Sequence, residues 1–291
     1  MAIPEFRLPS GAKLAQLAYG TGTVWCKENE DEVDRPTVDI IKTAIALGYR
    51  HLDGAQYYKN ETELGIAIKE SGVPRSEFFI TTKVFGHKDI EGHLRASLQK
   101  IGTDYIDLYL IHEPFSAGGS EEALQKAWRD IEACHEKGLA RDIGVSNFLV
   151  ADVQAVLKTA KTKPAVNQIE LHAYLQRTKL VEFCQSNGIV VEAYAPLTPL
   201  TKASPGPVDD VVNKLAKKYG VSASALLLRW LIEKDIVAIT TSGKEERLKG
   251  YLSEVPSLKL SQQEVDDISK AGEGKKFRQY MAELYEKDSY E

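Results

Sequence analysis

The sequence has little cysteine, no long apolar run and no excess of positive charge. Its three cysteines, Cys26, Cys134 and Cys184, are far apart and form no CxxC pair. This pattern excludes a disulfide framework and a zinc ribbon, which need closely spaced, paired cysteines. No stretch approaches the ~18 apolar residues of a membrane-spanning helix, and the first residues do not resemble a secretory signal. We therefore expect a cytoplasmic protein.

The charge balance argues against two classes of partner. The chain of 291 residues has 37 Lys and Arg against 42 Asp and Glu, a net charge of −5. Nucleic acids and anionic membranes are bound by concentrated basic surfaces, and the sequence shows no such cluster. With 43% hydrophobic residues, a chain of this length buries a full core without disulfides or metals.

Short apolar runs alternate with amphipathic helical patterns along the whole chain. A predicted β-hairpin at residues 6–17 is followed by strand-like runs at 18–20, 51–53, 78–84, 105–111, 143–146, 166–171, 189–195 and 236–240. Helical patterns lie at 37–47, 61–71, 90–101, 121–137, 149–159, 178–187, 209–219 and 223–233. This rhythm predicts a (β/α)8 TIM barrel, α/β in class, as a single domain over residues 1–291.

Two further features bear on the architecture. A doubly wound sheet with a dinucleotide-binding GxGxxG turn is the competing fold, but the partial match at residues 20–25 has Trp25 at the position of the third glycine. The tail at 273–291 has Phe277, Tyr280 and Tyr285 at helical spacing. We expect a C-terminal helix that either packs on the barrel or forms a flap over the pocket.

Polar residues gather where a barrel enzyme carries its chemistry, at the carboxyl ends of the strands. Asp53, Lys83 and His112 end three successive strands. Buried ionisable groups are costly unless they are paired, so three of them in succession favour a site over coincidence.

Tyr58 follows the first of these strand ends and completes a plausible acid catalyst. A tyrosine titrates near 10, and we expect the Lys83 ammonium to favour the phenolate and lower that pKa. Asp53 would keep Lys83 charged and oriented. A neutral His112 would direct a carbonyl oxygen toward the phenol, which gives a general acid beside an oxyanion pocket.

Hydrolase and metal motifs are missing. The sequence has no GxSxG motif, and its six histidines form no HExxH pair. We expect no metal, although distant ligands leave a metal-dependent barrel enzyme open.

Several motifs in one order resemble those of aldo-keto reductases. They are HLDGAQYY at 51–58 with Glu63-Leu-Gly65, LYLIH at 108–112, GVSNF at 144–148 and Asn167-Gln168. The resemblance implies NADPH-dependent reduction of an aldehyde or ketone by a monomer. It makes Asp53, Tyr58, Lys83 and His112 the catalytic tetrad, with Tyr58 as proton donor. It assigns the cofactor to Gly22, Thr23, Ser146, Asn147, Gln168, Tyr194, Leu197 and Leu200, and the substrate to Trp25, Phe85, His112 and Phe115.

The eighth strand departs from the family pattern. Many members have Pro-Lys-Ser, with the lysine on the adenosine 2′-phosphate, where this chain has Thr240-Thr241-Ser242. Thr241 and Ser242, supported by Lys244 and Arg247, can still bind a dianion through charge-assisted hydrogen bonds. The alternative is a solvated, charged start of a helix. Gly250-Tyr251 also replaces the common Glu-Asn pair near the adenine.

Three short segments resemble one branch of this family in particular. TTSGKEERL, GTGTVW and LIHEPF are most similar to fungal α-keto amide and conjugated polyketone reductases. This similarity implies dicarbonyl or α-keto substrates. The alternative function is an NADPH-binding regulatory subunit with vestigial activity, as in the channel-associated β subunits of the superfamily.

Overall fold

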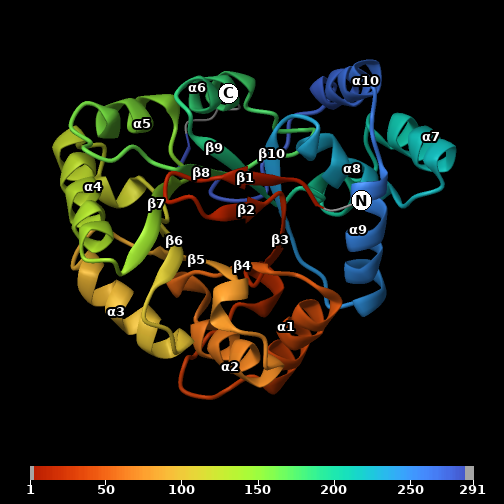
Figure 1. The fold of residues 1–291 in the computed structure, drawn as a ribbon. Helices are drawn as coiled ribbons and strands as arrows, with labels where there is room; N and C mark the ends of the chain where they lie inside the picture. The colour runs from red at the N-terminus through yellow and green to blue at the C-terminus, as the bar shows by residue number, and fades with distance from the viewer. Residues whose placement is uncertain (1–2, 286–291) are drawn as a thin grey trace.

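Eight parallel strands close into a barrel surrounded by helices (Figure 1). This computed structural model describes residues 3–285. The barrel strands are β3 Leu17–Gly20, β4 His51–Asp53, β5 Phe79–Val84, β6 Ile106–Ile111, β7 Ala140–Ser146, β8 Val166–Glu170, β9 Val190–Tyr194 and β10 Ile236–Thr240. Because β10 pairs with both β9 and β3, the sheet has no free edge. The predicted TIM barrel is confirmed.

The helices surround the outside of the barrel. They are α1 Arg35–Leu47, α2 Glu61–Ser71, α3 Ile90–Ile101, α4 Glu121–Glu136, α5 Val150–Leu157, α6 Thr178–Ser186, α7 Asp209–Tyr219, α8 Ala223–Ile232, α9 Glu245–Ser257 and α10 Gln262–Glu273. Helices α7 and α10 lie further out, with α7 packed on α8 and α10. The sequence patterns missed α9 and α10. A capping box between Ser261 and Glu264 begins α10 and was the local signal for it.

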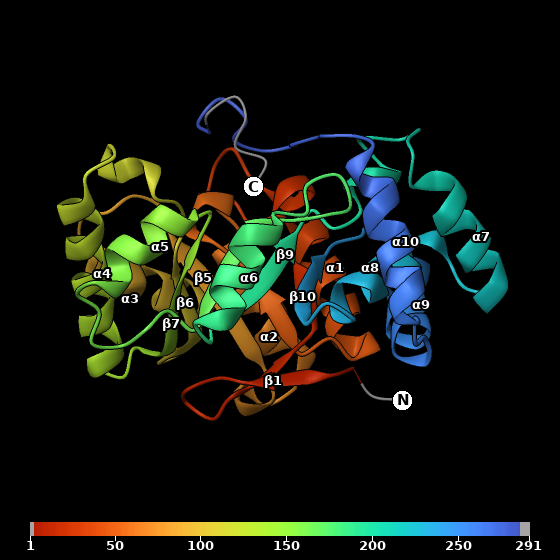
Figure 2. The same ribbon diagram turned by 90° about the horizontal axis from the view of Figure 1, so that it is seen from above.

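The predicted hairpin is present and closes one end of the barrel. Strands β1 Glu5–Arg7 and β2 Lys13–Ala15 pair antiparallel, and Leu8 and Leu14 join an apolar cluster with strand residues such as Leu108. Figure 2 shows the hairpin below the barrel and the segment after α10 crossing the opposite end. The polar strand ends therefore lie on the face that the hairpin leaves uncovered.

The tail differs from its prediction. Residues 274–285 contain no helix, and residues 286–291 lie outside the described part of the chain. The backbone N–H groups of Gln279 and Tyr280 donate to the Glu170 carboxylate at 2.6 and 2.9 Å. The predicted tail helix is wrong because these backbone donors bind a side chain of β8 in place of helical carbonyls.

Residues 3–285 can be searched for disulfides, metal-ligand clusters and membrane-spanning helices. In this part of the chain all three cysteines are free. The same residues form no cluster of metal-ligating side chains. No helix within them is long and apolar enough to span a membrane.

Candidate active site

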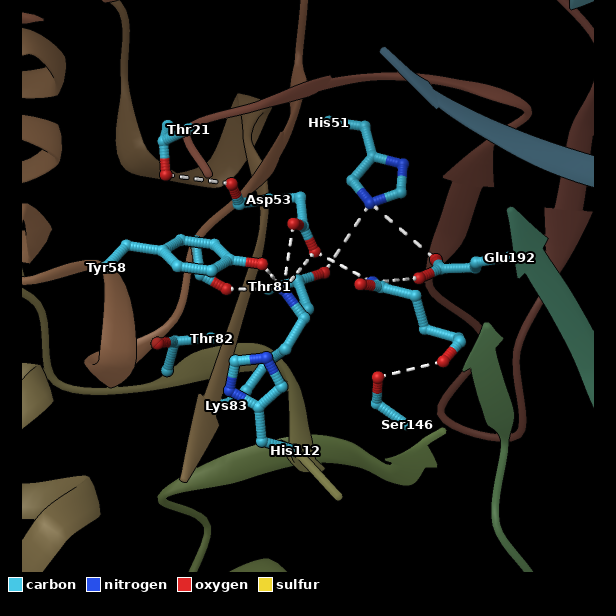
Figure 3. A network of polar contacts seen from close by, with 12 residues as sticks. Thr21, His51, Asp53, Tyr58, Thr81, Thr82, Lys83, His112, Ser146 and Glu192 are labelled. Carbon is cyan, nitrogen blue, oxygen red and sulfur yellow. Dashed lines mark hydrogen bonds and ion pairs between the residues drawn. The ribbon is translucent and has the colours of Figure 1, made fainter. Parts of the chain in front are cut away.

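Lys83, Asp53 and Tyr58 meet at the open end of the barrel (Figure 3). Lys83 Nζ lies 2.8 and 2.9 Å from the two Asp53 carboxylate oxygens and 3.4 Å from Tyr58 Oη. It also donates to the carbonyl oxygen of Gly54 at 2.7 Å. Lys83 on β5 and Asp53 on β4 are both buried, so the ion pair is formed away from water. The structure thus brings together three of the four residues of the predicted tetrad.

The pKa of Tyr58 departs from expectation. Burial raises it well above its usual value, and the negative charge of Asp53 raises it further. The ammonium of Lys83 is already engaged by Asp53 and Gly54, which explains why it does not offset these effects. We expected Lys83 to lower this pKa, whereas the pKa is raised. Tyr58 holds its proton at neutral pH, as a proton donor must.

His112 ends β6 in an aromatic surrounding. The rings of Tyr57, Tyr58 and Phe85 lie 5.8–6.1 Å from its imidazole, all nearly perpendicular to it. Burial and the charge of Lys83 lower the pKa of His112 to about 3. Its Nδ1 is buried without a hydrogen-bond partner among the described residues. His112 is thus neutral. Its unpaired Nδ1 distinguishes it from a core histidine whose ring nitrogens are both hydrogen-bonded.

Gly22 allows the loop after β3 to lie against Tyr58. A Cβ atom at this position would be 2.8 Å from Tyr58 Cζ, closer than real contacts allow. Asn60, which is fully buried, holds the same loop by donating to the carbonyl oxygens of Thr21 and Trp25 at 2.7 and 2.9 Å. The tight turn is thereby tied to the start of α2.

The predicted amide-binding residues connect directly to the tetrad. Gln168 Nε2 donates to Asp53 Oδ2 at 2.8 Å. Asn147 Nδ2 donates to the carbonyl oxygen of His112 at 3.0 Å, and Tyr194 Oη donates to Asn147 Oδ1 at 2.8 Å. Ser146 Oγ donates to the Gln168 carbonyl oxygen at 2.8 Å. The ends of β7, β8 and β9 thus form one polar wall.

The residues predicted to bind the adenosine 2′-phosphate lie at the end of β10 and the start of α9. Thr240 and Ser242 are buried, and Ser242 Oγ accepts a hydrogen bond from the backbone of Lys244 at 3.0 Å. Lys244 and Arg247 are exposed around the start of α9. Trp25, which we expected at the substrate, donates from Nε1 to Thr241 Oγ1 at 3.0 Å. The structure therefore places Trp25 beside a residue predicted to bind the cofactor.

The tail crosses this face of the barrel. The Tyr280 ring lies 5.8 Å from that of Tyr194, and Tyr285 Oη donates to the carbonyl oxygen of Asn147 at 3.0 Å. Phe115, predicted in the substrate pocket, meets the Tyr285 ring edge to face at 5.1 Å. Gln279 accepts from Thr198 in the η5 turn Thr198–Leu200, whose neighbours are the predicted Leu197 and Leu200. These contacts favour a covering segment over a helix packed elsewhere.

Sequence reasoning assigned no role to three residues here. Tyr57 is 58% exposed and packs on Phe85, which is 45% exposed, with ring centroids 4.8 Å apart. Glu170 accepts the hydrogen bonds from the tail backbone. Glu192 lies next to Gln168, and its Oε2 is 2.8 Å from Gln168 Nε2. For Glu192 the available signal was a carboxylate inside an otherwise apolar strand, which is costly to bury without a partner.

The chain is similar to known proteins in sequence and in fold. The profile of the aldo/keto reductase family matches residues 16–273. The chain belongs to the aldo/keto reductase family. It is 42% identical over 279 residues to an NAD/NADP-dependent indole-3-acetaldehyde reductase of Schizosaccharomyces pombe, covering 95% of this chain and 98% of that one.

Two other members extend the comparison. An NADPH-dependent alpha-keto amide reductase of Saccharomyces cerevisiae is 38% identical over 302 residues, with 98% of this chain and 96% of that one covered. The crystal structure of a Bombyx mori aldo-keto reductase in complex with NADP superimposes with a TM-score of 0.84 at 32% identity, covering 93% of each chain. The family resemblance is confirmed over nearly the whole barrel.

Proposed function

We propose that this aldo/keto reductase reduces aldehydes or ketones to alcohols with NADPH, and that Tyr58 is the proton donor. The observation that carries this proposal is the contact of Lys83 with both Asp53 and Tyr58, at 2.8 and 3.4 Å. A neutral His112 lies beside the same phenol. A module that only binds a cofactor has no need of this ion pair, so the arrangement favours the enzyme over the regulatory subunit.

The residues divide the work of carbonyl reduction. When bound, NADPH supplies the hydride. His112 and Tyr58 hold the carbonyl oxygen, and Tyr58 Oη gives its proton to that oxygen as negative charge develops there. The phenolate left behind is stabilised by the Lys83 ammonium, which Asp53 holds in place. Water then returns a proton to Tyr58.

The donor set fits the two ends of the cofactor. Amide and hydroxyl groups on Ser146, Asn147 and Gln168 match a carboxamide, and the Tyr194 ring offers a stacking surface beside them. The part of the cofactor between its nicotinamide and adenosine ends would be flanked by Gly22, Thr23, Leu197 and Leu200. The 2′-phosphate would lie at the start of α9, near Thr240, Thr241, Ser242, Lys244 and Arg247.

The aromatic residues suggest the substrate class. Tyr57 and Phe85 expose their rings beside His112, and Phe115 lies next to the tail. Such a rim favours a flat or apolar carbonyl compound over a charged sugar. The similarity to an alpha-keto amide reductase supports dicarbonyl or α-keto compounds within that class.

Parallel fluorescence titrations with NADPH and NADH test the cofactor assignment. Trp128 and Trp230 are buried in α4 and α8, so Trp25 is the indole beside the site. We expect tighter binding of NADPH, with the preference reduced about tenfold in Arg247→Ala. Lys249→Ala, an exposed change on the same helix, is the matched control. Equal binding of both nucleotides would refute the 2′-phosphate contact, and binding of neither would refute the function.

A further inference from the structure

Gln168 is held between two carboxyl groups. It faces Glu192 in the register of β8 and β9, and its Nε2 lies 2.8 Å from Glu192 Oε2 and 2.8 Å from Asp53 Oδ2. All three side chains are almost fully buried. Figure 3 shows Glu192 and Asp53 within one connected polar network.

These contacts determine which way the amide faces. A primary amide has two N–H donors on one side and an acceptor oxygen on the other. Asp53 and Glu192 both present oxygen acceptors, and they take one N–H each. Turning the amide over would place its oxygen against a buried carboxylate and leave the acceptors unpaired, which is costly in a buried site. No hydrogen bond within residues 3–285 reaches Gln168 Oε1, so this acceptor remains available.

Glu192 can accept this bond without adding a charge beside Asp53. Burial and the negative charge of Asp53 together raise its pKa to about 8, so it is mainly a neutral acid at pH 7. Its Oε1 faces His51 Nε2 at 3.8 Å. His51 donates from Nδ1 to the carbonyl oxygen of Ala15, and its pKa is lowered by burial. Lys83, on the other side of Asp53, remains the one cation in this group.

We propose that Glu192 is a positioning residue that orients the Gln168 amide, so that Gln168 offers the cofactor an acceptor oxygen and no donor. This inference rests on the proposed NADPH function. It predicts that the site selects a pyridine substituent that carries an N–H. A carboxamide provides that donor, whereas an acetyl group of the same shape does not.

The test compares two reduced cofactors in binding alone. One is NADPH, and the other is its 3-acetylpyridine analogue, in which a methyl group replaces the amide nitrogen. For the wild-type protein we expect the dissociation constant of the analogue to exceed that of NADPH by about tenfold, the effect of one lost hydrogen bond in a buried site. Tryptophan fluorescence reports both constants without any turnover.

Variants at Glu192 then separate orientation from packing. Glu192→Gln keeps an acceptor for Gln168 and is expected to preserve the wild-type ratio of the two constants. Glu192→Met has a similar volume but leaves Asp53 as the one acceptor of the Gln168 amide, so the amide is held less firmly and the ratio should fall severalfold. Glu192→Leu serves the same comparison if the Met variant does not fold, as judged by circular dichroism.

The outcomes distinguish the two proposals. Wild-type protein that binds neither nucleotide would refute the proposed function itself. Wild-type protein that selects NADPH, together with a Met or Leu variant that selects it equally well, would overturn the role of Glu192 and leave the reductase intact. Loss of selection in the Met or Leu variant but not in the Gln variant supports it.

Discussion

Lys83 forms an ion pair with Asp53 in which Nζ contacts both carboxylate oxygens, at 2.8 and 2.9 Å. The Tyr58 hydroxyl is further from the same ammonium, at 3.4 Å. In the resting protein the charge of Lys83 is thus balanced by Asp53, and Tyr58 stays protonated. The ammonium becomes important for Tyr58 once the phenol has given up its proton, which is the state that the proposed carbonyl reduction would create.

Removal of the Tyr58 hydroxyl should abolish most turnover without affecting cofactor binding. We expect Tyr58→Phe to lower kcat by about 10²–10⁴-fold and to leave the dissociation constant of NADPH within about twofold. Tyr105→Phe is the control, since that ring is held by Arg75 and Arg141 away from the tetrad. Substantial turnover in Tyr58→Phe, measured by NADPH oxidation, would show that another group supplies the proton.

Loss of one charge of the buried Asp53–Lys83 pair should lower the free energy of unfolding more than loss of both, whereas either loss should remove activity. Lys83→Met leaves the Asp53 carboxylate buried without its cation, and we expect a loss of about 3–5 kcal/mol in the free energy of unfolding. The double variant Asp53→Asn/Lys83→Met removes both charges and should recover most of that loss while remaining inactive. Urea unfolding measures the first effect. Additive destabilisation in the double variant would contradict the pairing.

The close approach of Gly22 to Tyr58 predicts an activity defect from a single methyl group. Because the added Cβ of Gly22→Ala would lie 2.8 Å from Tyr58 Cζ, either the loop or the phenol must move. We expect kcat/KM to fall at least about tenfold, since displacement of a catalytic group by about 1 Å has large effects. Ser186→Ala, an exposed change on α6, should retain full activity. Unchanged kinetics in both variants would contradict this contact.

Glu192 predicts a pH dependence of stability. Its folded-state pKa is raised to about 8 from 4.5, so the folded protein retains a proton that the unfolded chain releases. The resulting stability is fully present below the unfolded value and is lost as the pH rises through the folded value, at about 1.4 kcal/mol per pH unit.

Unfolding at pH 5.5 and 7.5 measures this loss. We expect the wild-type protein to lose about 3 kcal/mol more than Glu192→Gln between these two pH values. His51 and Lys83, the nearby bases, are common to both proteins, so the difference isolates Glu192. Parallel pH profiles would show that Glu192 is already ionised in the folded state.

Sequence patterns predicted the barrel well because parallel strands are buried on both faces and read as apolar runs. They also located Asp53, Lys83 and His112, since a charge at a strand end is visible locally. They failed for the tail helix, whose backbone donors bind Glu170, a residue more than 100 positions away. The Tyr58 pKa and the role of Glu192 depend on how many partners each side chain meets in space. No local pattern carries that information.

Transfer of isotope from the cofactor to the product tests the central claim most directly. The protein would be mixed with NADPH that carries deuterium at both C4 positions, together with an α-keto ester, and the product analysed by mass spectrometry. The account predicts an alcohol with one deuterium on the carbinol carbon, formed by the wild-type protein and nearly absent with Tyr58→Phe. An alcohol without deuterium, or no alcohol despite tight binding of NADPH, would contradict it.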